Sequence, residues 1–149
     1  MGLSLWIGGL TLFVTVVTPI SFRSLPREEA GRYIGLLFPA VDRWSLVWST
    51  AAFFSLWGFY GGRYLHPRSL VLELPVGVMT VLTWYLVGVL HPQVREARQK
   101  MLQPELQGTV HRQKFQIAFD RFHRLSVRIH AVILFLGWFV LASIPSFLV

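Results

Sequence analysis

The feature that most limits how this chain can fold is a set of long stretches without a charged side chain. Residues 44–62 and 74–94 contain no Asp, Glu, Lys or Arg, and neither does the segment 129–149. Each stretch approaches the ~20 apolar residues that an α-helix needs to cross ~30 Å of hydrocarbon. A helix also satisfies its own backbone hydrogen bonds in lipid. The pattern therefore predicts a multi-pass α-helical membrane protein.

Composition indicates a single membrane domain over residues 1–149. The chain is only 14% charged, whereas a soluble domain carries roughly 25% charged residues. The first apolar segment lacks the basic region and cleavage site of a signal peptide, so we expect it to be retained as a span. The predicted fold is an all-α integral membrane four-helix bundle. Its spans are expected at about residues 2–22, 41–64, 69–92 and 126–147.

Proline residues predict where the connections break. Pro26 is followed by Glu28 and Glu29, which is typical of a helix start. Pro39 is expected to end or kink this short interfacial helix before the second span begins. Between the third and fourth spans, residues 93–128 predict an amphipathic cytoplasmic helical extension with a break near Pro104.

The basic residues are divided unevenly between the connections. Of 14 Lys and Arg residues, the middle turn holds only Arg63 and Arg68, and the other two connections hold the rest. The positive-inside rule therefore places these two connections in the cytoplasm and both termini outside. The chain has a net charge of +7, and its basic residues flank the apolar runs. This position indicates binding to anionic lipid at the cytoplasmic face rather than to nucleic acid. The basic helix at residues 113–128 could instead hold an anionic ligand or partner.

Polar side chains form a stripe on each of the last two predicted spans. One ~60° sector of the third span carries Glu73, Gly77, Thr80, Trp84, Gly88 and His91. A stripe of the fourth helix carries Asp120, His123 and His130, with Arg128 close by. Because lipid offers no partner for a carboxylate or an imidazole, we expect the stripes to face each other inside the bundle. We also expect Asp120 to be paired with a cation.

Histidines suggest the chemistry of this polar cluster. Neutral imidazole binds haem iron and transition metals. His123 and His130 are about 10 Å apart along one helix, so His91 with His123 is the more plausible metal-ligating pair. The alternatives are a structural hydrogen-bond network and a relay for protons or solutes. The cofactor is therefore left open, with haem or a transition metal as the candidates.

A seam of small and hydroxylated residues lies along the first span. Such residues let transmembrane helices approach closely and hydrogen-bond across their interface. We therefore expect helix packing along this side of the span. The seam consists of Ser4, Gly8, Thr11, Thr15 and Thr18.

Several short motifs, in a specific order, resemble a family of small four-span membrane proteins. They are Trp6-Ile7-Gly8-Gly9, the segment 18–26, Ala30-Gly31, Phe38-Pro39 and the segment 119–126. The family is the domain of unknown function 4149, which is similar to transmembrane protein 205. The resemblance implies a four-helix membrane bundle but no reaction. In size and topology the chain also resembles, more loosely, the membrane domains of copper-resistance proteins and the haem-binding membrane protoporphyrinogen oxidases, which place histidines within the bundle.

The sequence carries no motif of a known catalytic site. It lacks a Gly-rich phosphate loop, a His-Glu-x-x-His pattern and a nucleophile elbow, and it has no cysteine. We therefore predict a non-enzymatic accessory or assembly component of a larger membrane complex, with partner subunits in the membrane. One alternative is a histidine-based haem or metal protein in metal tolerance or electron transfer. The other is a small transporter, which at this size would have to oligomerise.

Overall fold

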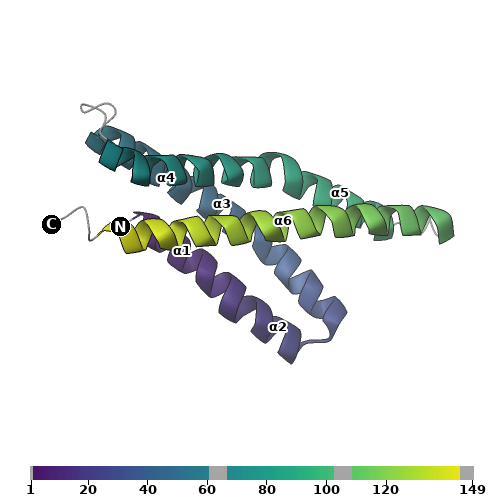
Figure 1. Ribbon diagram of the computed structural model, residues 1–149. Helices are drawn as coiled ribbons and strands as arrows, with labels where there is room; N and C mark the ends of the chain where they lie inside the picture. The colour runs from purple at the N-terminus through teal and green to yellow at the C-terminus, as the bar shows by residue number, and fades with distance from the viewer. Residues whose placement is uncertain (1, 61–66, 103–108, 145–149) are drawn as a thin grey trace.

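The computed structural model describes residues 2–60, 67–102 and 109–144. All regular structure in these residues is helical and forms four long rods (Figure 1). This confirms the predicted all-α membrane bundle. The elements are α1 (Gly2–Leu12), the π-turn η1 (Phe13–Val17), α2 (Thr18–Ser24), α3 (Arg27–Tyr60), α4 (Pro67–Tyr85), the π-turn η2 (Leu86–Leu90), α5 (His91–Leu102) and α6 (Thr109–Ser143).

Three helical segments in the described part of the chain are long and apolar enough to cross a membrane. They are Gly2–Ser24, Leu70–Lys100 and Gln113–Ser143. The second predicted span lies on α3, whose Asp42, Arg43 and several hydroxyl side chains lower its hydropathy. The ends of the predicted spans beyond Tyr60 and residue 144, and the predicted break near Pro104, lie outside the described residues.

Of the two outcomes expected at Pro39, an end or a kink, the end of the helix is wrong. Helix α3 begins directly after Pro26, as expected, but it then runs through Pro39 without a break. Proline removes one backbone hydrogen bond and crowds the preceding turn, at a cost of ~3 kcal/mol. Contacts to neighbouring groups help to hold this part of the helix. Arg98 of α5 donates from Nη1 to the carbonyl of Gly31 over 3.3 Å, and Arg43 donates from Nε to the carbonyl of Pro39 over 3.3 Å.

Consecutive rods run antiparallel, and the start of α1 lies at the same end of the molecule as the end of α6 (Figure 1). At the opposite end, α2 and the start of α3 diverge from α6, whereas α5 continues beside it (Figure 1). The main core lies between the first rod (α1, η1 and α2), the third rod (α4, η2 and α5) and α6. Its buried side chains are Trp6, Ile7, Leu10, Met79, Leu86, Leu90 and Ile133.

Gly137 marks the closest approach between the helices of this core. It is buried on α6, and a Cβ atom there would clash with Ile7 of α1. The same Cβ would lie 3.2 Å from Cε of Met79 on α4. A residue without a side chain therefore lets α1, α4 and α6 pack against one another at this level.

Candidate functional site

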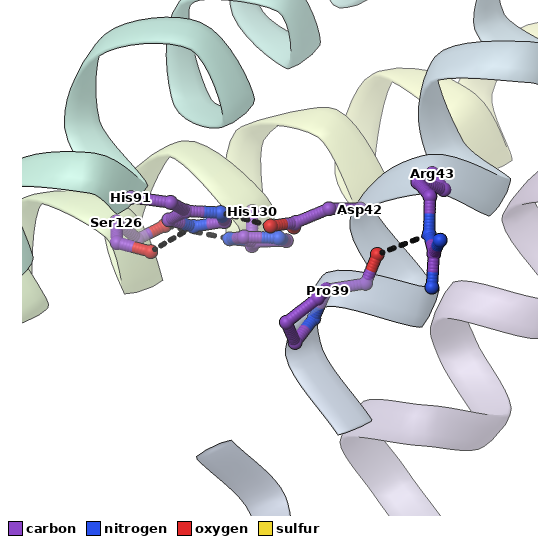
Figure 2. A network of polar contacts seen from close by, with 6 residues as sticks. All are labelled: Pro39, Asp42, Arg43, His91, Ser126 and His130. Atoms are coloured by element: carbon purple, nitrogen blue, oxygen red, sulfur yellow. Dashed lines mark hydrogen bonds and ion pairs between the residues drawn. The ribbon is translucent and has the colours of Figure 1, made fainter. Parts of the chain in front are cut away.

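A chain of three polar side chains connects three helices inside the bundle. Asp42 comes from α3, His91 from the start of α5 and Ser126 from α6, and all three are buried. His91 Nδ1 lies 2.8 Å from Asp42 Oδ2, and His91 Nε2 lies 3.1 Å from Ser126 Oγ (Figure 2). An ionised carboxylate only accepts, so Nδ1 donates to Asp42. In the neutral imidazole, Nε2 then accepts a hydrogen bond from the Ser126 hydroxyl.

His130 adds a second imidazole to this chain. Its Nδ1 donates to the backbone carbonyl of Ser126 over 2.9 Å. Its ring stacks on that of His91, with centroids 5.8 Å apart and an interplanar angle of 11°. Phe38 of α3 meets both rings edge-on, at centroid distances of 5.6 Å to His91 and 6.4 Å to His130. We call Asp42, His91, Ser126 and His130 the buried network.

The π-turn η2 sets the direction in which His91 points. A π-turn holds one residue more than an α-turn, so the residues after it are rotated by about 100°. In an uninterrupted α-helix, His91 would share a sector with Glu73 and Trp84. With the π-turn, His91 instead joins the buried face of this rod, which includes Thr83 and Leu86. This rotation brings its ring between Asp42 and Ser126.

A small cavity of about 10 Å³ lies beside the buried network. This is close to the minimum volume that holds one water molecule. Polar and apolar side chains from α1, α3, the third rod and α6 all line it. The lining residues are Trp6, Leu10, Asp42, Ser45, Thr83, Leu86, Val87, His91, His130 and Ile133.

The structure separates the residues that the two predicted polar stripes grouped together. Only His91 and His130 belong to the buried network. Glu73 is half-buried on α4, and Trp84 is exposed, donating from Nε1 to Thr50 Oγ1 over 3.3 Å. The predicted inward orientation of Trp84 is therefore wrong, because it lies outside the buried sector of α4.

The predicted pairings on α6 are also wrong. His123 is exposed and stacks on Phe119 at 5.7 Å, so it does not pair with His91. Asp120 is exposed and makes no hydrogen bond or ion pair to any other described residue. Arg128 is exposed as well. The reason is that α5 is the main neighbour of α6 at this level, so one side of the helix stays uncovered (Figure 1).

Asp42 is the central residue that the sequence interpretation missed. The Asp42-Arg43 pair lies at the start of the predicted second span, so the sequence alone places it where that span enters the membrane. A signal was present, because Asp42 lies on the same helical face as Ser45 and Ser49, three and seven residues later. Both serines are buried, and the Ser49 carbonyl accepts a hydrogen bond from Thr80 Oγ1 over 3.2 Å. Extending that face by one turn would have placed Asp42 inside the bundle.

The network geometry suits a hydrogen-bonded clamp better than a metal centre. Both ring nitrogens of His91 already contact protein groups, so a metal ion would have to displace Asp42 or Ser126. In the described part of the chain, no three His, Asp or Glu side chains are grouped so that they could share an ion. The candidate pair His91 and His123 is not brought together.

The fold and its apolar helices define a small all-helical membrane protein. Residues 1–103 match a family described as a domain of unknown function (DUF4149), and the chain belongs to this family. The matched segment contains Asp42 and His91 and ends before α6, which supplies Ser126 and His130. No curated protein and no solved structure matches the chain.

Proposed function

We propose that this chain is a non-enzymatic accessory or assembly component of a larger membrane complex. The observation that carries the proposal is the exposed part of the seam of small residues on the first rod, on both sides of Thr11, to which Trp138 of α6 donates a hydrogen bond over 3.3 Å. Ser4, Gly8 and Thr15 are exposed, and Gly8 has no described atom within 4 Å of the position a Cβ would take. Small residues at a helix surface permit the close approach of another transmembrane helix.

The threonine hydroxyl groups of the seam are satisfied within their own helix. Thr11 Oγ1 donates to the carbonyl of Ile7 over 2.7 Å, and Thr15 Oγ1 donates to the carbonyl of Thr11 over 2.8 Å. At its threonines the seam therefore presents a shallow surface without an unpaired donor, and this suits packing against a partner helix. The faces of α1 that carry Trp6 and Leu10 are already buried in the core.

The interior of the bundle supports a non-enzymatic role over the two alternatives. Small-molecule and cofactor sites occupy roughly 300–1,000 Å³, whereas the cavity beside the buried network measures about 10 Å³. A haem group or a transported solute would need a rearranged interior. The buried network instead bonds α3, α5 and α6 to one another, which favours a structural role in the bundle.

The charge distribution supports a specific orientation of the bundle in the membrane. We place four spans in the bilayer, with both termini outside and the basic ends of the rods facing anionic lipid in the cytoplasm. Arg23 lies in the last turn of α2 and Arg27 begins α3, at the end of the molecule away from the start of α1. At that end α5 also carries Arg95 (Figure 1). Reporter fusions placed after Lys100 and at the C-terminus are expected on opposite sides of the membrane. Finding both on one side would contradict this topology.

Crosslinking from the seam tests the accessory role. Because the chain has no cysteine, Gly8→Cys and Thr15→Cys each give one site for a benzophenone maleimide in native membranes. Irradiation is expected to yield a discrete protein adduct from both positions, because a partner helix covers the seam. Leu5→Cys is the matched control, since Leu5 is exposed on α1 but lies off the seam.

Two results would count against the proposal. One is adduct formation that is equally strong from position 5, which would indicate random collisions. The other is crosslinking to lipid alone at positions 8 and 15. Mass spectrometry of the adduct identifies whether the partner is another protein or a second copy of this chain.

A further inference from the structure

One side chain that lines the cavity beside the buried network carries a hydrogen-bond donor without an acceptor among the described residues. Trp6 of α1 is 0% exposed, and its indole Nε1 is buried without a hydrogen-bond acceptor among the described residues. Buried polar groups in folded proteins are nearly always bonded, either to protein or to ordered water. Trp6 also lines the cavity, together with Asp42 and Thr83, whose side chains carry oxygen acceptors.

We propose that this cavity binds one water molecule, which accepts a hydrogen bond from the Trp6 indole and donates to the Asp42 carboxylate. The volume of about 10 Å³ matches a single water and excludes a larger guest. A buried water typically makes two to four hydrogen bonds, and this lining offers that number of polar groups.

The mixture of donors and acceptors selects a neutral ligand. An indole N–H is a donor only, so it cannot ligate a cation and needs an acceptor. An anion would meet the carboxylate of Asp42. Thr83 Oγ1 already donates to the carbonyl of Met79 over 2.8 Å, so its remaining lone pair accepts. Water both accepts from Trp6 and donates to the oxygens of Asp42 and Thr83, and an apolar guest would do neither.

The water extends the polar contacts of the bundle to its first helix. The direct hydrogen bonds of the buried network join α3, α5 and α6, whereas Trp6 belongs to α1. The water bridge thereby connects all four rods. The inference does not rest on the accessory role, so its failure would leave the seam and its crosslinking test unaffected.

Nuclear magnetic resonance of the indole protons tests the proposal. The full chain is labelled with ¹⁵N at its Trp indoles and placed in nanodiscs of deuterated lipid. Trp6→Phe assigns the Trp6 signal by its loss. If that variant does not fold, single Trp→Phe variants at the other five positions assign it by elimination. The Trp6 Hε1 proton is expected to show a dipolar cross peak at the water frequency and a downfield shift typical of a bonded indole.

A change of one methyl group distinguishes this cavity from other sources of the signal. Val87 lines the cavity, whereas Val89 lies on the same π-turn and is exposed outside the lining. Val87→Ile is expected to abolish the cross peak and shift Trp6 Hε1 upfield, and Val89→Ile should change neither. The proposal is overturned by an unbonded Trp6 indole with no water cross peak. It is equally overturned if the cross peak survives in Val87→Ile.

Discussion

The two halves of α6 carry similar side chains in opposite surroundings. In the first half, Asp120 and His123 are exposed on the side that no other rod covers. In the second half, Ser126 and His130 belong to the buried network, where Ser126 Oγ hydrogen-bonds to His91 of α5 and the ring of His130 stacks on that of His91. An imidazole at the first site can exchange its partners for solvent or lipid headgroups, whereas one at the second cannot. The comparison teaches that the neighbouring helices, rather than the residue type, decide which polar groups stabilise the fold.

The largest effect is expected from removing the centre of the buried network. His91→Ala leaves the Asp42 carboxylate buried without its partner, which should cost ~3–5 kcal/mol of unfolding free energy. Denaturant unfolding in detergent, followed by circular dichroism, measures this loss. His123→Ala removes the same side chain from the exposed half of α6 and should change stability by less than ~0.5 kcal/mol.

A double variant sharpens this expectation. Once His91 is absent, Asp42→Asn should restore part of the lost stability, because a neutral amide replaces the unpaired charge. Equal losses from His91→Ala and His123→Ala would instead show that burial does not distinguish the two histidines.

An intermediate effect is expected where the helices approach most closely. Gly137→Ala inserts a methyl group against Ile7 and Met79, and such overpacking costs roughly 1–3 kcal/mol. Gly8→Ala is the control, because no described atom lies within 4 Å of the added Cβ. At Gly8 the substitution should stabilise the helix by roughly 0.5–1 kcal/mol, because alanine restricts the unfolded chain. Thermal unfolding midpoints in detergent should therefore move in opposite directions for the two variants.

The smallest effect is expected at Asp120. Because its carboxylate is exposed and unpaired among the described residues, Asp120→Ala should change the unfolding free energy by less than ~0.5 kcal/mol. The pairing of Asp120 with a cation that the sequence predicts would instead make this substitution destabilising. A loss comparable to that of His91→Ala would restore the predicted pairing and contradict the exposure of this face.

The helices were predictable from the sequence, because hydrophobicity along the chain determines which segments can enter a bilayer. Long uncharged runs and the Pro26 start needed no knowledge of tertiary contacts. The path of α3 through Pro39 was not predictable in this way. Arg98 lies 67 residues from Gly31, and their hydrogen bond is a contact that no local pattern encodes.

The site was predictable only in part. His91 and His130 were identified because an ionisable group in an apolar segment needs a partner. Their true partners were missed for two physical reasons. The apolar pattern places Asp42 at the membrane boundary, and a uniform rotation of about 100° per residue places His91 on the wrong face of the third rod. The π-turn that changes this rotation leaves no visible mark in the residues Leu86–Leu90.

That π-turn also means that the segment Leu86–Leu90 holds one residue more than a regular α-helix needs to place His91. Deleting a single residue from Leu86–Leu90 would convert the wide turn into an α-turn. The deletion turns every later residue by about 100° and the loss of the π-turn turns it back, so His91 would stay between Asp42 and Ser126. An α-helix of unchanged length through this segment would instead direct His91 away from both partners. A homologue shorter by one residue here would therefore keep its membrane spans, its histidine and the hydrogen bonds that join them.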